Sequence, residues 1–96
     1  MRMLLKVSMP VGKGSEAAKS GLLTQTIQST MEALKPEAAY FYPEDGKRTA
    51  IMIFDMTGSW QLPAILEPLF QVGASIHVTP VMNAEDLQRG FKEAGM

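Results

Sequence analysis

The segment "AAYFYPEDGKRTAIMIFDM", residues 38 to 56, decides the fold. Two runs rich in aromatic and β-branched residues flank the sequence "PEDG" at residues 43 to 46. In that turn proline and aspartate favour a tight reversal, and glycine accepts a positive φ. The segment therefore predicts a β-hairpin.

The residues before the hairpin predict a strand and a helix. Residues 2 to 9 place apolar side chains at every second position, which is typical of a strand, and Pro10 ends it. Residues 11 to 21 predict a loop with one helical turn from Ser15. Residues 22 to 35 carry an apolar stripe with the period of a helix, so we expect a helix that lies on the sheet.

After the hairpin, residues 57 to 73 predict a second helix. Ser59 is a plausible N-cap, Pro63 is tolerated in the first turn, and Pro68 is expected to kink or interrupt the helix. Residues 74 to 81 then predict the last strand.

Residues 84 to 94 predict a C-terminal helix. Asn83 suits its N-cap position, and Leu87 and Phe91 share one side. Because an isolated helix of about 11 residues is marginal in water, we expect these two side chains to anchor it, either on its own subunit or on another copy.

The order β-α-β-β-α-β plus a tail helix predicts an α+β fold of the ferredoxin-like type. Such a fold has a four-stranded antiparallel sheet with both crossover helices on one face. The 96 residues support one such domain, residues 1 to 96. The opposite face of the sheet is then left uncovered.

The uncovered face is expected to be too apolar for water. If Met52 and Phe54 face the helices, the alternation puts their neighbours on the other side. The apolar and aromatic members of that side are Leu4, Tyr40, Tyr42, Ile51 and Ile53. A contiguous patch of this kind predicts a partner or a ligand, and we expect a homodimer joined sheet to sheet.

In element order, length and half-apolar open face, the chain resembles the dimeric α+β barrel superfamily. The resemblance covers nearly the whole chain and includes no diagnostic motif. It implies a homodimer with a pocket beside each sheet, in which a small apolar or aromatic molecule binds. The chain is distantly similar to the muconolactone-isomerase-like and the uncharacterised small bacterial members of that superfamily.

His77, the only histidine, is the candidate catalytic residue, because imidazole is the side chain best suited to exchange protons near neutral pH. We expect it to face the dimer cavity beside Lys6 or Ser8 of the first strand and to be partly buried there. Taking the first and third strands as parallel, we expect the polar groups to meet at one end of the sheet. The expected ligand-binding residues are Lys6, Ser8, Tyr40, Asp55, Trp60 and Ser75.

Each candidate also has a structural interpretation. His77 and Asp55 lie about two strand spacings apart, roughly 10 Å, so a direct dyad needs a bridge through Lys6, Ser8 or water. Lys6 either contacts a ligand or spans the apolar face to reach solvent. Trp60 either lines a pocket or plugs the edge of the core.

Several classes of function are not expected. The net charge of −1 without a basic run disfavours nucleic acid, and no segment is long and apolar enough for a membrane. Without cysteine or a second histidine we expect no metal site, and Glu85 and Asp86 are interpreted as helix-start acids.

No cofactor is expected either. The sequence "GKGSEA", residues 12 to 17, lacks the spacing of a phosphate loop. The first strand lacks the asparagine that heme-degrading members of the superfamily carry, since Asn83 is the only one. The N-terminus has no signal-peptide pattern, so a cytoplasmic location is expected.

Two classes of function remain open. One is a small-molecule enzyme such as an isomerase or a cofactor-free monooxygenase. The other is a non-catalytic structural or ligand-binding dimer. A histidine enclosed in a pocket would favour the first, and a histidine packed against its two-fold mate would favour the second.

Overall fold

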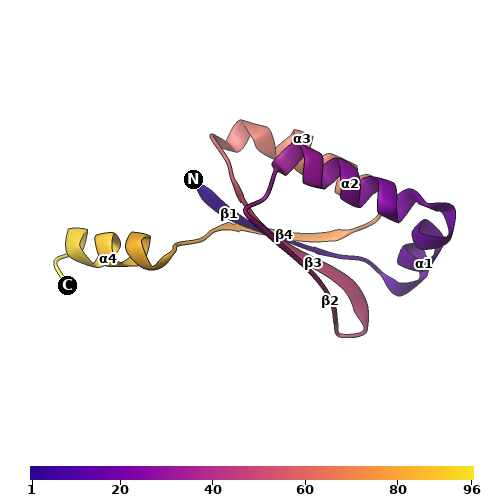
Figure 1. Ribbon diagram of the computed structural model, residues 1–96, viewed down its shortest axis with the longest axis horizontal. Coiled ribbons are helices and arrows are strands. Elements are labelled where there is room, and N and C mark those ends of the chain that lie inside the picture. The colour runs from indigo at the N-terminus through magenta and orange to yellow at the C-terminus, as the bar shows by residue number, and fades with distance from the viewer.

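In the computed structural model, which describes residues 1–96, three helices cover one face of a four-stranded antiparallel sheet (Figure 1). The strands are β1 (Arg2–Ser8), β2 (Ala38–Glu44), β3 (Lys47–Asp55) and β4 (Ser75–Pro80), in the spatial order β2-β3-β1-β4. The helices are α1 (Val11–Ser20), α2 (Leu22–Leu34), α3 (Leu62–Gln71), which follows a 3₁₀ turn (Ser59–Gln61), and α4 (Ala84–Glu93). The chain is therefore α+β, as expected, and is compatible with a ferredoxin-like fold.

The hairpin between β2 and β3 turns in two residues. Asp45 and Gly46 have φ angles of 51° and 74° between the paired residues Glu44 and Lys47. Two successive positive φ angles are characteristic of a type I′ turn, whose twist matches that of the flanking strands. The predicted hairpin is confirmed.

The core lies between the sheet and the helices, on one side of the central strands. The largest side chains without solvent access are Leu5 and Phe54, one on each central strand. The core cluster consists of Met3, Leu5, Val7, Met9, Phe54, Met56, Leu69 and Ala74. Met52 is also buried, so the predicted faces of β1 and β3 are confirmed.

The segment after β1 differs from the sequence prediction. Residues 11 to 20 form a ten-residue helix, α1, and not a loop. Glycines at positions 12 and 14 lower helix propensity, but Gly14 and Ala17 are buried, and a Cβ added to Gly14 would come within 3.3 Å of the Met9 Cβ. Close packing of small residues on the sheet therefore outweighs propensity.

The entry to α3 also differs from expectation. Ser59 caps no helix, because it begins the 3₁₀ turn, and the Gln61 side chain accepts the backbone N–H of Thr57 at 2.7 Å. Pro63 lies in the first turn of α3 as expected. The helix continues through Pro68 without interruption.

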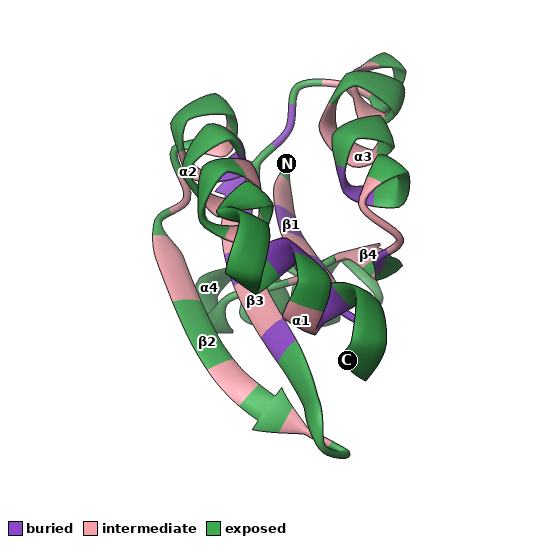
Figure 2. Ribbon diagram, turned by 90° about the vertical axis from the view of Figure 1, so that its right-hand side faces the viewer, coloured by how far each residue is buried: buried purple, intermediate pink, exposed green.

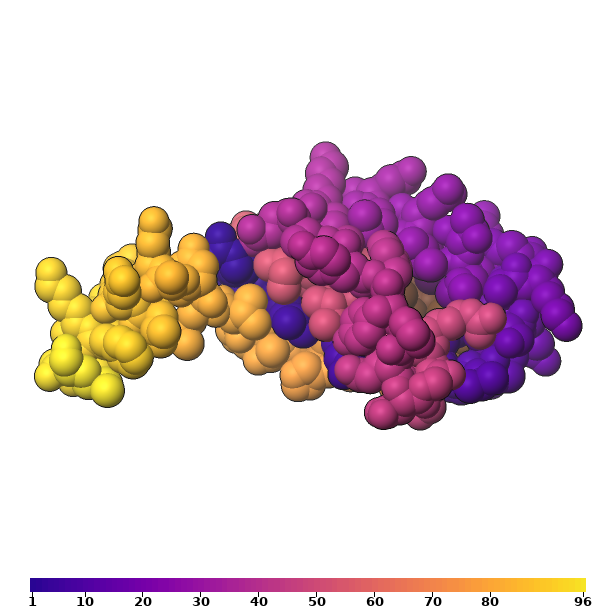
Figure 3. All heavy atoms as spheres, turned by 60° about the horizontal axis from the view of Figure 1, so that its bottom comes forward, coloured from indigo at the N-terminus to yellow at the C-terminus, as the bar shows by residue number.

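The C-terminal helix α4 projects away from the rest of the molecule (Figures 1 and 3). All its residues are exposed. Its polar tie to the sheet is an ion pair between Arg2 and Asp86 at 3.2 Å, and Asn83 caps its first turn by accepting the N–H of Asp86 at 2.8 Å. The expected alternative in which Leu87 and Phe91 anchor the helix on its own subunit is therefore wrong.

The turn geometry predicts opposite effects for two glycine substitutions. Gly46→Ala places a Cβ at positive φ and should lower the free energy of unfolding by about 1 kcal/mol. In Gly12→Ala the added Cβ in α1 meets no atom within 4 Å. This variant should have a free energy of unfolding that is unchanged or higher by up to about 1 kcal/mol. Urea unfolding of both variants checks this, and equal destabilisation would contradict it.

Candidate functional site

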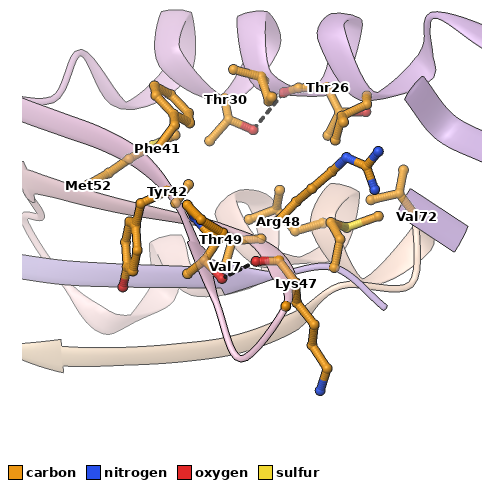
Figure 4. Close-up of a pocket in the computed structure, with 17 residues that line it drawn as sticks. Val7, Thr26, Thr30, Phe41, Tyr42, Lys47, Arg48, Thr49, Met52 and Val72 are labelled. Carbon is orange, nitrogen blue, oxygen red and sulfur yellow. Dashed lines mark hydrogen bonds between the residues drawn. The ribbon is translucent and has the colours of Figure 1, made fainter. Parts of the chain in front are cut away.

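A predominantly apolar hollow lies between α2 and the β2-β3 side of the sheet (Figure 4). It has a volume of about 700 Å³, within the range of small-molecule pockets. Its walls are Leu23 and Ile27 of α2 and Phe41, Ala50 and Met52 of the sheet. The apolar stripe of α2 therefore faces a cavity along part of its length.

Arg48 brings a charged group into this cavity. Figure 4 shows its side chain extending between α2 and the sheet, with the guanidinium towards Thr26 and Val72. One guanidinium nitrogen donates to the Ser15 hydroxyl at 3.4 Å, and Arg48 forms no ion pair. No acidic side chain lines the cavity. Lys47, the preceding residue, also borders the cavity, but its side chain points away from α2.

The residues expected to form a polar site lie on the other face of the sheet. Tyr40, Ile51, Lys6 and His77 form one row across the four strands. Tyr42, Thr49, Ser8 and Ser75 form the next row. Directly paired residues share a face of the sheet. His77 therefore lies beside Lys6, and Ser75 beside Ser8, as expected.

The expected meeting of Ser8 and Asp55 is wrong. β1 and β3 run antiparallel, so Ser8 pairs with Thr49 while Asp55 pairs with Arg2 at the opposite end of the sheet. β2 runs in the same direction as β1, and the hairpin after β2 reverses the chain, so β3 is antiparallel to both. Asp55 contacts the amino group of Met1 at 2.8 Å and is far from His77.

Lys6 is held by a carboxylate that the sequence prediction did not include. Its ammonium forms an ion pair with Glu44 on the edge strand, and Tyr42 donates its hydroxyl proton to Glu44 at 3.3 Å. The pair spans β3, where Thr49 is buried. The side chain of Lys6 thus extends across the apolar face to the sheet edge, which is the structural alternative to contacting a ligand.

The three groups shift one another's protonation equilibria. The hydrogen bond from Lys6 lowers the pKa of Glu44, and the same bond raises the pKa of Lys6. Burial raises the pKa of the Tyr42 phenol, and the neighbouring Glu44 carboxylate adds to this. All three groups therefore keep their neutral-pH charge states over a wider pH range than free side chains.

His77 is exposed in the single chain, and its partial burial in a dimer cavity stays a prediction. Its paired neighbour is the cation Lys6, and the next residues on its face, Ser75 and Thr79, carry hydroxyls. The carboxylate of Glu44, on the edge strand, is already engaged by Lys6. The chain alone therefore provides His77 with no acidic partner.

Trp60 and Tyr40 lie apart from each other and from the cavity. Trp60 is 73% exposed, and its ring covers Gly58, where an added Cβ would approach it to 1.9 Å. It borders a second hollow of about 710 Å³ between α2 and α3. It therefore does not plug the core, and it does not join the polar rows. Tyr40 is 67% exposed on the edge strand.

Sequence reasoning missed Arg48 and Glu44, although a signal for each was present. Arg48 shares the core side of its strand with Met52 by the period of two, and a charged residue on that side marks a cavity or a rim. Glu44 shares the open side with Tyr40 and Tyr42 by the same period. The cavity itself has no local sequence signal.

Comparison with known proteins identifies no family. Neither a model of a known protein family nor a curated protein sequence matches the chain. No three histidine or acidic side chains lie close enough together to hold a metal ion. None of the helices has the length and hydropathy needed to cross a membrane.

The ion pair between Lys6 and Glu44 predicts a pH effect with a defined sign. Because the folded pKa of Glu44 is lowered, the ion pair stabilises the fold above the ordinary glutamate range, and this stabilisation is lost as the pH falls through the folded value. Lys6→Met should raise the pKa of Glu44 towards its ordinary value. NMR titration of the Glu44 carboxyl carbon measures it.

Lys47→Met is the control for this titration. Lys47 pairs with Glu44 in the hairpin register but forms no ion pair with it. It should leave the Glu44 titration unchanged. A Glu44 midpoint that is the same with and without Lys6 would contradict the assignment.

Proposed function

We propose that this protein is a homodimer that binds a small, largely apolar molecule carrying an anionic group in the cavity between α2 and the sheet. The observation that supports it is a cavity of about 700 Å³ with apolar walls and one guanidinium without an ionic partner. Binding sites of this composition orient an apolar ligand through a few polar groups.

The apolar walls favour the body of the ligand. Leu23, Ile27, Phe41 and Met52 are contributed by two different layers, and Phe41 is 53% exposed. A ligand between the layers would remove the exposed parts of Leu23, Ile27 and Phe41 from water, at about 25 cal/mol per Å² of apolar area. Aromatic or branched hydrocarbon groups fit such walls.

The charge at the rim favours an anion. Arg48 offers planar N–H donors that match a carboxylate or sulfonate, and no acidic group in the lining competes for them. The Ser15 hydroxyl, at 3.4 Å, is the hydrogen-bond partner that an incoming anion would join or replace. The proposed ligand class is therefore an apolar or aromatic acid.

The homodimer is supported by the open face of the sheet. Leu4, Ile51 and Ile53 occupy neighbouring strands on that face and keep partial exposure. Helices α2 and α3 lie on the other side of the sheet (Figures 1 and 2). A contiguous apolar surface of this kind is typical of an interface. Lys6 and Glu44 then form a polar border at one edge.

Binding is favoured over the isomerase and cofactor-free monooxygenase alternatives. General acid–base catalysis needs a group of suitable basicity within hydrogen-bond reach of the reacting atom. The cavity lining has no histidine and no carboxylate, and its polar residues are Thr26, Thr30, Tyr42, Lys47, Arg48 and Thr49. His77 lies on the opposite face of the sheet, where the single chain gives it no acidic partner.

Two fluorescent probes test the proposed ligand class. We expect 1-anilinonaphthalene-8-sulfonate and its uncharged analogue N-phenyl-1-naphthylamine both to bind the native protein. Arg48→Met should raise the dissociation constant of the sulfonate probe by about tenfold or more, because it removes a charge-assisted hydrogen bond. The same substitution should leave the dissociation constant of the uncharged probe within about twofold, since the apolar walls are unchanged.

Controls separate this site from surface binding. Ala50→Phe fills part of the cavity and should weaken binding of both probes, while Lys92→Met on α4, which removes a cation outside the cavity lining, should weaken neither. Equal loss of both probes in Arg48→Met would refute the anion assignment. Undiminished binding in Ala50→Phe would refute the cavity.

The homodimer is tested by two substitutions at one position. Ile53→Asp puts an unpaired charge on the open face and should dissociate the dimer, whereas Ile53→Val should keep it. Sedimentation velocity at micromolar concentration measures the mass of each protein. A monomeric native protein at these concentrations would refute the dimer.

A further inference from the structure

We infer that the apolar side of α4 docks on a second copy of this chain, so that the C-terminal helix is an arm of the dimer. The inference rests on the homodimer of the proposed function and adds a contact surface that the sheets do not provide. It begins from the pattern of α4 itself. Ala84, Leu87, Phe91 and Ala94 follow one another at three, four and three residues, which puts them on one side of a helix.

This apolar side has no cover in the single chain. Leu87 and Phe91 are 40% and 44% exposed, and the helix extends beyond the end of the sheet (Figure 3). A ten-residue helix is marginal in water unless its apolar side is packed. Its capping box at Asn83 and Asp86 fixes its start but does not bury its apolar side.

The place of α4 in the fold connects it to the open face. Only residues 81 to 83 separate it from β4, and the N–H of Val81 still donates to the carbonyl of Arg2 at 3.1 Å. Arg2, whose position in β1 belongs to the open face, holds Asp86 by its guanidinium at 3.2 Å. The arm therefore starts at the border of the surface through which two copies meet.

The size of the open face indicates that two copies need a further contact. Four strands at about 4.8 Å spacing and about six residues of about 3.3 Å give a footprint of about 400 Å². A stable interface buries about 800 Å² on each partner. A helix of ten residues, about 15 Å long and about 10 Å wide, adds about 150 Å². In a two-fold dimer each copy both gives and receives an arm, which adds about twice that area.

The charges of α4 favour a protein partner over a lipid surface. Its polar side carries Glu85, Asp86 and Glu93 against only Arg89 and Lys92. Helices that lie on membranes are rich in lysine and arginine on that side. A second copy, which also exposes Trp60 and Phe70 outside its open face, is therefore the occupant that the composition supports.

The direct test removes the apolar side of the arm. Leu87→Ser/Phe91→Ser in the full chain should raise the dissociation constant of the dimer at least tenfold by sedimentation velocity. The matched control, Arg89→Ser/Lys92→Ser on the opposite side of α4, should leave it within about twofold, because exposed ion pairs contribute little. Neither change touches the core, since both pairs of side chains are exposed.

A second measurement locates the arm without depending on affinity. The chain has no cysteine, so Lys92→Cys carries a single spin label. The labelled protein is mixed with an equal amount of ¹⁵N-labelled native chain. We expect the label to broaden amide signals of the ¹⁵N copy outside α4.

The outcomes separate the arm from the dimer. A native dimer whose affinity is the same in Leu87→Ser/Phe91→Ser, with no broadening between copies, overturns the arm and leaves the sheet-to-sheet dimer standing. Binding of α4 to phosphatidylglycerol vesicles without such broadening overturns it in favour of a lipid surface. A native protein that is monomeric throughout overturns both the arm and the dimer.

Discussion

Alternation along the two central strands is the constraint on which the rest of the structure depends. β1 and β3 bury Leu5 and Phe54 against the helices, and every second residue between such positions must face the other way. Leu4 and Ile53 are therefore committed to the open face as soon as the core forms. Both crossover connections lie on the core side, and α4 leaves along the direction of the strands. The chain has no element left to cover its second apolar surface.

The small core also explains why α2 leaves a cavity beneath it. Only 13 of the 96 residues are buried, and α2 is positioned mainly by its contacts with α1 and α3. The sheet wall below it contains Met9 and Met52, whose unbranched side chains adapt to irregular space. A helix that is positioned by neighbouring helices, above methionine side chains that adapt their conformation, tolerates a cavity that a close-packed interface would exclude. The same arrangement leaves room for ligands of different shapes.

The sequence was sufficient for those features that depend on local alternation and turn chemistry. The hairpin, the faces of β1 and β3 and the pairing of His77 with Lys6 follow from a period of two and from the "PEDG" turn. The helix α1 could not be found this way, because burial of Gly14 outweighs its low helix propensity. Asp55 was misplaced because the expectation of parallel first and third strands overlooked the predicted hairpin, which already makes β3 antiparallel to β1. The cavity depends on the height of α2 above the sheet, which several distant contacts set together.

The position of His77 ties any chemistry on the open face to self-association. A proton-transferring imidazole is usually oriented through its second ring nitrogen by an acceptor such as a carboxylate. In the single chain His77 lies beside Lys6, and the carboxylate of Glu44 is already paired with that lysine at the sheet edge. The missing acceptor would have to come from the facing surface of a second copy, or from a ligand held between the two. Catalysis at His77 would therefore require the dimer, whereas the cavity under α2 is formed by one chain alone, so that the proposed ligand would bind in either state.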